Sequence, residues 1–572
     1  MSGLTYSDRP WLKIYEQIGL PYQFDYPKIP LFELIDRAAA EYPNSKSMVY
    51  FDREFTYVQL KEYTDRLANA LNKMGIKKGD VVGVQLFNSP QFLIGVYGAL
   101  KAGAIVALMS PLLPKPELEY ELSTSGAKVH ITDESRLEEV SEMRGRTKLE
   151  QVIVTSVRDF SPMEESSPPE VRGALQLRKV LSEAQPVPPR VDINPVEDVA
   201  LLFFTGGSTG IPKGVMLTHY NLSTNILQTF GPTAAGMLEP NKGNFSVMGC
   251  LPFFHIYGFT CAMNVALYWA GCLLLVPDAR DTKMIYDLLV KYRPLLMPGV
   301  PTQFMRLLQE KGVDLSELKG CVPYSGAAAL PPEISKKFEE KAGVLVSEGY
   351  GLSETSPVTH SNFVAILKGA GLDLGLPVKI GSIGIPVPDT DVRIVDIETG
   401  TKEMPVGEPG EMIIKGPQVM KGYWPTPGSG LRDGWLYTGD VAKMDEDGYF
   451  YIVDRTKDMI NVSGLKVYGR VVDDILYEHP AVAKAAAVGI PDPERPGSER
   501  VKAFIELKEG YKPSEELKED IIRHCREKLP PYAVPKFVEF REELPLTVTE
   551  KVFKRKLREE EIEKMKKAGL LK

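Results

Sequence analysis

Residues Leu201–Gly214 read LLFFTGGSTGIPKG, and this stretch decides how the rest of the chain is interpreted. The apolar run Val199–Phe204 predicts a buried strand. Glycines let the backbone approach a ligand closely, and successive N–H groups with one lysine can hold phosphate oxygens. The loop is not a Walker A motif, because Ile211-Pro212 separates Gly210 from Lys213. We therefore predict a phosphate-binding loop made of Thr205, Gly206, Gly207, Ser208, Thr209, Gly210, Lys213 and Gly214.

Length, charge and cysteine content exclude several classes of protein. A chain of 572 residues is too long for one core, so we expect roughly two to four folding units. A net charge of −8 argues against nucleic acid as a main partner. Five scattered cysteines without a CxxC pair are typical of reduced thiols, which favours a cytoplasmic protein. The opening residues, MSGLTYSDRPWLK, lack the apolar core of a signal peptide.

One uncharged segment has to be considered as a membrane span. No Asp, Glu, Lys or Arg occurs from Gly243 to Pro277. A spanning helix needs about 20 consecutive apolar residues. Pro252, His255 and Gly271 interrupt this run. We therefore expect buried structure here and no integral membrane span.

The first part of the chain alternates strand-like and helix-like runs. Ser89-Pro90 offers a helix N-cap followed by a first-turn proline. This alternation predicts an α/β fold whose parallel sheet is covered on both faces. The elements expected are strands at Val81–Phe87, Ala104–Leu108 and Ala127–Thr132 and a helix at Phe92–Lys101.

The pattern changes twice further along. Asp391–Val395 and Glu411–Lys415 are short strand-like runs separated by turns, which predicts a small barrel or an antiparallel sheet. From Asp454 on, short helices and strands alternate to the end. We predict a large N-terminal domain of doubly wound sheets with a small β-barrel-like part at residues 1–456, and a small α+β C-terminal domain at residues 457–572.

A second group of small, aromatic and acidic residues follows a strand predicted at Val344–Ser347. It reads EGYGLSET over Glu348–Thr355. With the glycine loop, it resembles the two signatures of the adenylate-forming enzymes, which include acyl-CoA synthetases, luciferases and peptide-synthetase adenylation domains. The second signature of that family is Y-G-x-[ST]-E. Further motifs follow in the family's order, so the resemblance covers nearly the whole chain.

The resemblance implies a role in ATP binding for each motif. Tyr350, followed by Gly351, would stack on adenine, Thr355 would bond the α-phosphate, and Glu354 would hold Mg²⁺. A carboxylate can accept hydrogen bonds from both ribose hydroxyls, and Asp440, in Trp435–Asp440, matches the family's TGD element. The remaining ATP contacts that the resemblance implies are Gly326 and Ala327, which line the adenine and the acyl group, and Arg455, which contacts ribose or phosphate.

The C-terminal motifs imply two reactions in one cleft. Lys551, in Leu544–Lys551, matches the catalytic lysine of the family's P-x-T-x-x-G-K motif. Lys457 matches the hinge about which the small domain rotates. Ser463 and Gly464 match the place where the CoA thiol arm passes. Three positions depart from the family's pattern: Glu550 replaces a glycine, Gly469 a common proline and Val471 a common glutamate.

The resemblance also extends to one branch of the family. The chain is most like archaeal and bacterial fatty-acid-CoA ligases, which implies ATP-dependent activation of a fatty acid through an acyl-adenylate, transfer to CoA, and release of AMP and pyrophosphate. His255 would lie beside the substrate carboxylate. The uncharged segment predicts an apolar acyl pocket for a medium or long chain, formed by Phe254, Ile256, Tyr257 and Val300.

Several alternatives remain open. An aryl- or short-chain-acid CoA ligase would share every motif and differ only in the lining of its pocket. A luciferase-like oxygenase and a non-catalytic acyl or nucleotide sensor are further alternatives. Neither the acyl chain length nor the oligomeric state follows from the sequence, and a homodimer is one of the states allowed.

Overall fold

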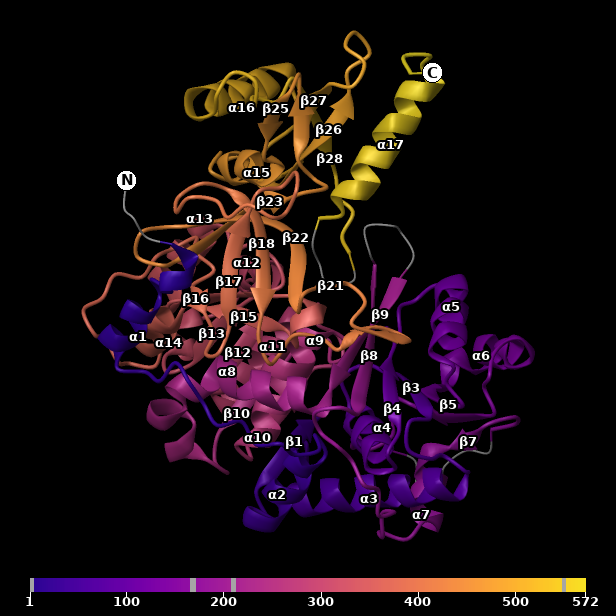
Figure 1. Cartoon of the computed structure of the whole chain (residues 1–572). Helices are drawn as coiled ribbons and strands as arrows, with labels where there is room; N and C mark the ends of the chain where they lie inside the picture. Colours follow the sequence, from indigo (N-terminus) through magenta and orange to yellow (C-terminus); the bar gives the residue numbers. More distant parts are fainter. Residues whose placement is uncertain (1–4, 165–170, 207–211, 548–551, 572) are drawn as a thin grey trace.

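The computed structural model describes residues 5–164, 171–206, 212–547 and 552–571 (Figure 1). One nine-stranded sheet, with the order β20-β19-β9-β8-β4-β3-β5-β6-β7, carries the glycine loop. Strands β8, β4, β3, β5, β6 and β7 pair in parallel, whereas β9 pairs antiparallel with β8. The strands are β3 (Val81–Gln85), β4 (Ile105–Leu108), β5 (Val129–Asp133), β6 (Gln151–Thr155), β7 (Leu175–Gln176), β8 (Val199–Gly206), β9 (Pro212–Thr218), β19 (Gly422–Tyr423) and β20 (Thr426–Pro427).

A second nine-stranded sheet has the order β16-β15-β14-β13-β12-β10-β11-β1-β2. Its central strands pair in parallel from β1 to β14, and β2, β15 and β16 are added antiparallel at the two edges. The strands are β1 (Lys46–Tyr50), β2 (Arg53–Thr56), β10 (Ser246–Gly249), β11 (Cys272–Leu275), β12 (Leu296–Gly299), β13 (Val322–Ser325), β14 (Ser347–Gly351), β15 (Val358–Ser361) and β16 (Ile385–Pro386).

Helices cover both faces of each sheet, as the sequence predicts. Neighbouring residues of one strand point to opposite faces, so Val82 lies in a core shared by both sheets while Val81 lies in an outer core. The shared core contains α2 (Glu33–Glu41), α3 (Tyr57–Lys73), α4 (Pro90–Lys101), α8 (His219–Met237) and α10 (Val265–Tyr268). The outer cores contain α5 (Lys115–Ser125) and α6 (Leu137–Met143) on one sheet, and α11 (Thr282–Tyr292), α12 (Pro301–Gln309) and α13 (Pro332–Ala342) on the other.

The β-rich part is a five-stranded antiparallel sheet. Its order is β17-β18-β22-β21, with β23 also paired to β22. Within the described residues no pairing closes these strands into a ring, so the sheet is open rather than a barrel. The strands are β17 (Asp391–Val395), β18 (Gly410–Lys415), β21 (Leu431–Arg432), β22 (Trp435–Met444) and β23 (Phe450–Arg455).

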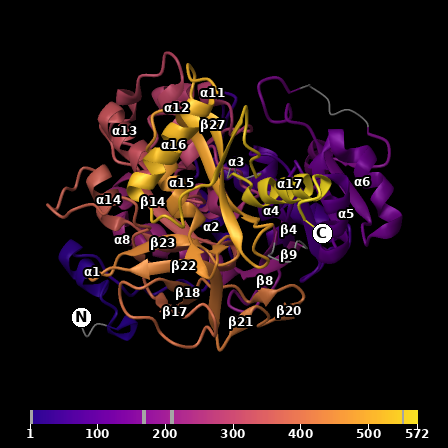
Figure 2. The ribbon, with the colours of Figure 1, turned by 90° about the horizontal axis from the view of Figure 1, so that it is seen from above.

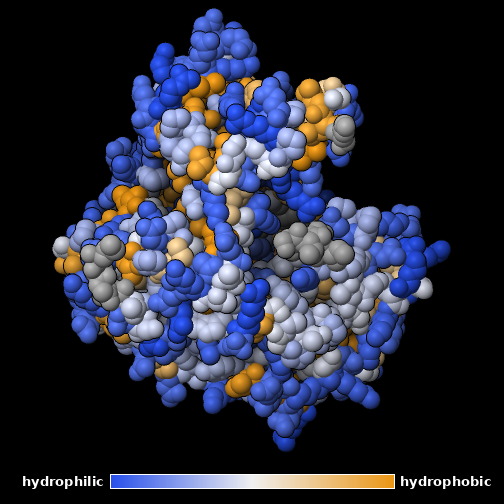
Figure 3. All heavy atoms as spheres, turned by 45° about the horizontal axis from the view of Figure 1, so that its top comes forward, coloured by the Kyte–Doolittle hydropathy of each residue, from blue (hydrophilic) through white to orange (hydrophobic). Residues whose placement is uncertain are grey.

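The C-terminal part has two sheets of its own, β24-β25 and β26-β27-β28, and two small cores, separate from those of the large part. It lies at the top in Figure 1 and covers the large part when seen from above in Figure 2. Figure 3 shows a hollow in the surface beneath it. Its elements are β24 (Ile460–Val462), β25 (Leu465–Val467), α15 (Gly469–Tyr477), β26 (Val482–Pro491), β27 (Glu499–Leu507), α16 (Glu515–Lys528), β28 (Phe537–Arg541) and α17 (Lys554–Lys567).

The uncharged segment from Gly243 to Pro277 is buried structure. It contains β10, α9 (Ile256–Gly258), a π-helix at Phe259–Asn264, α10 and β11. Across the residues that the structure describes, no helix combines the length and the apolar character that crossing a bilayer requires. All five cysteines are buried and free. The remaining helices are α1 (Leu12–Ile18), α7 (Leu177–Glu183) and α14 (Phe363–Gly369).

Candidate active site

The two strands that flank the glycine loop bring its ends to Tyr423. β8 ends at Gly206 and β9 begins at Pro212, so Gly207, Ser208, Thr209 and Gly210 lie outside the described residues. Thr205 pairs with Lys213 in the antiparallel register. Lys213 is exposed, and its Nζ lies 5.1 Å from the centroid of the Tyr423 ring. Lys213 therefore contacts Tyr423, a residue that none of the sequence motifs contains.

Tyr423 also contacts the second motif. Its hydroxyl donates a hydrogen bond to Glu354 Oε1 at 2.9 Å, and the backbone N–H of Met420 donates to the carbonyl oxygen of Glu354 at 2.8 Å. Burial, with Glu354 close by, raises the pKa of Tyr423 and keeps its hydroxyl protonated. Lys213, Tyr423 and Glu354 thus form one cluster. A cation and a carboxylate at one edge of a glycine loop suit a phosphate with its metal ion.

Three residues predicted to bind adenosine form a second cluster. Tyr350 lies in β14, and its hydroxyl donates to Asp440 Oδ2 at 2.5 Å. Asp440 pairs with Arg455 in the register of β22 and β23, and Arg455 Nε donates to Asp440 Oδ1 at 3.1 Å. The side chain of Asp440 is 5% exposed and that of Arg455 is 47% exposed. The structure therefore connects an aromatic ring, a buried carboxylate and an accessible guanidinium.

Burial and the negative charge of Asp440 set the protonation of this group. They raise the pKa of Tyr350 well above its ordinary value, so its hydroxyl stays a donor. The ring of His360 packs edge-on against Tyr350, with centroids 5.9 Å apart, and burial lowers the pKa of His360 to about 3. The neutral imidazole supports the ring of Tyr350 from the side. The aromatic platform is thus held both by its hydroxyl and by its edge.

The hydroxyl that the sequence analysis assigns to the α-phosphate points into the protein instead. Thr355 is 0% exposed, and its Oγ1 donates to the carbonyl oxygen of Pro357 at 2.5 Å and accepts the N–H of Leu352 at 3.1 Å. Backbone groups therefore engage this hydroxyl and keep it from a ligand. The hydroxyl position of the Y-G-x-[ST]-E pattern falls on Ser353, which is half-buried.

Gly326, in the turn after β13, packs closely against Tyr257. A Cβ on Gly326 would lie 3.0 Å from Cζ of Tyr257. The ring of Tyr257 cannot move away easily, because its hydroxyl donates to the carbonyl oxygen of Tyr324 at 2.6 Å. Ala327, the next residue, has a φ of 66°. The turn after β13 is thus fixed against a buried tyrosine.

Replacing Gly351 by alanine is expected to destabilise the protein. The added Cβ would lie 1.9 Å from the carbonyl oxygen of Pro357 and 2.5 Å from its carbonyl carbon, both of them backbone atoms. We expect a loss of about 3 kcal/mol, the upper end of the usual cost of overpacking. Thermal and denaturant unfolding midpoints measure it. Gly145→Ala is the matched control, because nothing lies within 4 Å of its added Cβ. Equal midpoints for the two variants would contradict the prediction.

The residues predicted for the acid come together around Tyr257. Ile256, Tyr257 and Val300 are buried, and Phe254 is half-buried against the shared core. His255 caps α9, and its Nδ1 accepts the N–H of Tyr257 at 3.3 Å. Thr260 Oγ1 donates to the carbonyl oxygen of Ser356 at 2.7 Å, which joins the apolar segment to the second motif. The apolar residues therefore adjoin the nucleotide motifs.

The C-terminal residues lie in two exposed turns. Lys457 is exposed in the turn between β23 and β24. Ser463 and Gly464 are exposed in the turn between β24 and β25, where the N–H of Ser463 donates to Ser498 Oγ at 2.9 Å and the N–H of Gly464 to Asn461 Oδ1 at 2.9 Å. Lys551 lies outside the described residues. The turn that contains Ser463 therefore makes these hydrogen bonds within the C-terminal part.

Comparisons with known proteins identify the family of this chain. A family model described as AMP-binding enzyme matches residues 35–424, and a model of the C-terminal domain of AMP-binding enzymes matches residues 471–551. The chain belongs to the AMP-binding enzyme family. A long-chain-fatty-acid–CoA ligase of Bacillus subtilis is 39% identical over 97% of this chain and 99% of its own length. One of Escherichia coli O6:H1 is 33% identical over 93% of this chain and 94% of its own.

A solved structure shares the fold of this AMP-binding enzyme. The crystal structure of the anthranilate CoA ligase AuaEII in complex with anthranoyl-AMP superposes with a TM-score of 0.81 at 28% identity. The match covers 95% of this chain and 98% of that one. The predicted α/β architecture, with large N-terminal sheets and a smaller C-terminal part, is therefore confirmed.

Proposed function

We propose that this AMP-binding enzyme is an ATP-dependent acyl-CoA synthetase that activates a medium- or long-chain fatty acid. The observation that carries the proposal is that the second motif contributes to two clusters, because Glu354 belongs to Lys213–Tyr423–Glu354 and Tyr350, four residues earlier, belongs to Tyr350–Asp440–Arg455. The first suits a metal-bound phosphate and the second suits an adenosine. The fatty-acid ligases of Bacillus subtilis and Escherichia coli, which are similar along nearly their whole length, support the same substrate class.

In the first half-reaction, a carboxylate oxygen of the acid attacks the α-phosphorus of ATP and pyrophosphate leaves. Negative charge builds up on the phosphate oxygens, so fixed cations and donors contribute most to the rate. Lys213 and the N–H groups of the glycine loop would hold the outer phosphates. Ser353, rather than Thr355, would contact the α-phosphate, because Ser353 is half-buried whereas Thr355 is fully buried. Lys551 would bridge the α-phosphate and the carboxylate.

A magnesium ion fits the carboxylate of Glu354. Mg²⁺ is usually bound by one or two carboxylates together with substrate phosphates. In the described part of the chain, no three His, Cys, Asp or Glu side chains form a protein-only metal cage, whereas Glu354 and the loop lysine Lys213 both contact Tyr423. The bound ion would neutralise charge on the phosphates. Tyr423 would orient the carboxylate for it.

In the second half-reaction, the CoA thiol attacks the acyl carbonyl and AMP leaves. The proposal assigns this step to the surface around Ser463 and Gly464. Both residues are exposed and contact their own part of the chain, so they would reach the site only after residues 457–572 rotate about Lys457. Residues 1–456 would stay fixed around the nucleotide.

Activity is expected to rise from acetate to octanoate and palmitate. Burial of each methylene is worth about 0.8 kcal/mol, so an apolar pocket around Ile256, Tyr257 and Val300 rewards longer chains. The measurement is acid-dependent exchange of labelled pyrophosphate into ATP, with and without CoA. No exchange with any acid would overturn the enzyme proposal itself.

The second candidate is an aryl-acid CoA ligase. The shared fold with an anthranilate CoA ligase supports it. The same exchange assay separates the two, because an aryl ligase would prefer benzoate or anthranilate to octanoate and palmitate. Preference for acetate would instead point to a short-chain ligase.

A further inference from the structure

The backbone of Gly469 is bound by a carboxylate from the other side of the predicted hinge. Gly469 begins α15, and its N–H donates to Asp454 Oδ2 at 2.5 Å. Asp454 belongs to β23, three residues before Lys457, and is 5% exposed. This bond therefore joins the strand that carries Arg455 to the first helix of the C-terminal part.

Lys554 closes the same junction from the far end of the chain. Its Nζ donates to Asp473 Oδ2 at 2.6 Å, and Asp473 also accepts the N–H of Ala487 at 2.5 Å. A Cβ on Gly469 would lie 3.2 Å from Lys554 Nζ and 3.7 Å from Asp454 Oδ2. The ammonium of Lys554 and the carboxylate of Asp454 thus both lie close to Gly469. Burial raises the pKa of Asp454 while the charge of Lys554 opposes that rise.

The residue after Gly469 carries a charge that acts across the same junction. Arg470, next to Gly469, interacts electrostatically with Glu348, which is buried just before the Gly349-Tyr350 pair. Arg470 Nε also lies 3.8 Å from Asp474 Oδ2 within α15. Gly469 therefore binds one carboxylate of the large part, and the charge of Arg470 acts on a second. In the sequence, Asp454 directly precedes Arg455, and Glu348 lies two residues before Tyr350.

We propose that Asp454 is a positioning residue whose hydrogen bond to Gly469 and attraction to Lys554 latch the C-terminal part in the conformation described here. The inference rests on the proposed two-step function. Rotation about Lys457 would separate Asp454 from Gly469 and Lys554, whereas Lys554 and Asp473 would move together. The turn at Ser463 and Gly464 is exposed while the latch is closed, so the latch opposes the thioester step and favours adenylation.

The latch accounts for Gly469, where related enzymes commonly have proline. Proline is well tolerated at the first position of a helix, but it has no N–H to donate. It would also bring ring atoms to a point where a Cβ already lies 3.1 Å from the carbonyl oxygen of Ala487. Glycine at this position supplies both the donor and the space.

The test compares Asp454→Ala and Gly469→Pro with matched controls. Gly469→Ala keeps the N–H and adds only the methyl group, and Glu408→Ala removes an exposed carboxylate of the large part. Adenylation is measured by pyrophosphate exchange, and thioester formation from synthetic acyl-adenylate plus CoA. Both latch variants are expected to raise the ratio of the thioester rate to the adenylation rate about tenfold, which corresponds to 1.4 kcal/mol. A ratio equal to that of the controls would overturn the latch.

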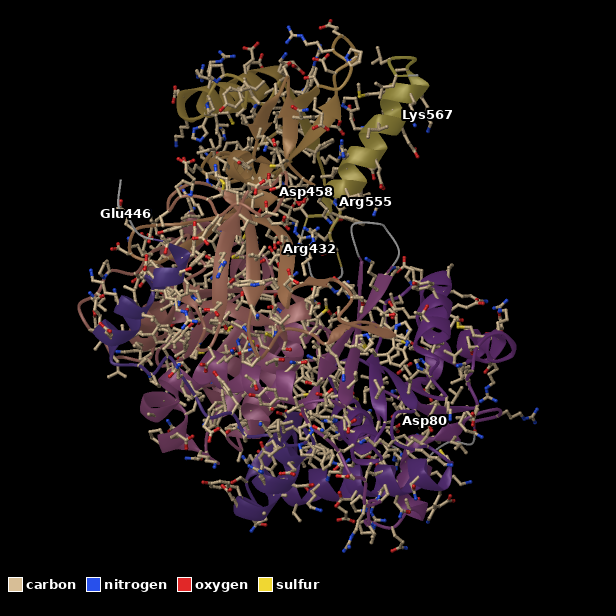
Figure 4. All side chains as sticks on the ribbon, viewed as in Figure 1. Asp80, Arg432, Glu446, Asp458, Arg555 and Lys567 are labelled. Atoms are coloured by element: carbon tan, nitrogen blue, oxygen red, sulfur yellow. The ribbon has the colours of Figure 1, made fainter. Side chains whose placement is uncertain are left out.

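A distance measurement reports the conformation without any substrate. Glu446 lies on the large part and Lys567 near the end of α17, both exposed (Figure 4). All five native cysteines are buried, so spin labels at Glu446→Cys and Lys567→Cys give one interdomain distance. The parent should show one dominant distance, and Gly469→Pro a second population. An unchanged distribution would overturn the latch.

The two proposals can fail separately. A parent protein that activates no acid would end the proposed function, while the distance distributions would still decide the latch. The converse outcome is an active parent for which the Asp454 and Gly469 variants leave the distance distribution and the rate ratio unchanged. That result would overturn the latch alone. If Asp454→Ala does not fold, Asp454→Asn, which keeps an acceptor but removes the charge facing Lys554, is compared with Gly469→Pro in the same two assays.

Discussion

Replacing Asp440 by alanine is expected to lower kcat/KM for ATP by at least about tenfold. A hydrogen bond to a charged acceptor is worth roughly 1.5–3 kcal/mol, and 1.4 kcal/mol corresponds to a factor of ten. Asp440 already binds the hydroxyl of Tyr350 and Nε of Arg455, yet each carboxylate oxygen can accept more than one bond. The ribose hydroxyls would use the remaining capacity. Initial rates of pyrophosphate release over a range of ATP concentrations measure the effect.

Two variants separate the direct role of Asp440 from its role as a partner of Tyr350. Tyr350→Phe removes only the hydroxyl that donates to Asp440 at 2.5 Å and keeps the ring. Its effect on kcat/KM for ATP should be smaller than that of Asp440→Ala. Asp440→Asn keeps the shape of the side chain and should fall between the two. An unchanged kcat/KM in Asp440→Ala would remove this residue from the nucleotide site.

Elements with local signals were predictable from the sequence. Ser89 caps α4 as expected, because its Oγ accepts the N–H of Phe92 at 3.3 Å, and Pro90 occupies the first turn. The apolar run before the glycine loop is β8, which extends to Gly206. The strand predicted at Val344–Ser347 was placed too early, since β14 spans Ser347–Gly351. Apolar side chains alone do not show where the hydrogen-bonded ladder begins.

Contacts between distant segments were not predictable. Tyr423 binds Glu354 across 69 residues, and a lone tyrosine in the two-residue strand β19 gives no local signal for this. Gly469 was recognised as a departure, yet its reason, the carboxylate of Asp454, lies 15 residues away across the hinge. Non-local geometry decides each of these cases.

Lys551→Ala is expected to slow adenylation about a hundredfold or more while thioester formation from a synthetic acyl-adenylate keeps most of its rate. The size follows from losing one preorganised electrostatic donor where charge builds up on the α-phosphate. In the proposed function, the second step uses the other face of the C-terminal part, near Ser463 and Gly464, so it should not depend on Lys551. Pyrophosphate exchange measures the first step, and CoA consumption the second.

Lys457→Pro should give the reverse pattern. Together, the two variants test whether rotation of the C-terminal part lets one cleft serve both reactions. Lys457 lies in an exposed turn between β23 and β24, so proline there fixes φ without disturbing a core. Adenylation should persist and thioester formation should fall. Equal damage to both steps by Lys551→Ala would contradict alternation. No damage to either would mean that the catalytic lysine lies elsewhere, because a cation that adenylation requires cannot be removed without cost.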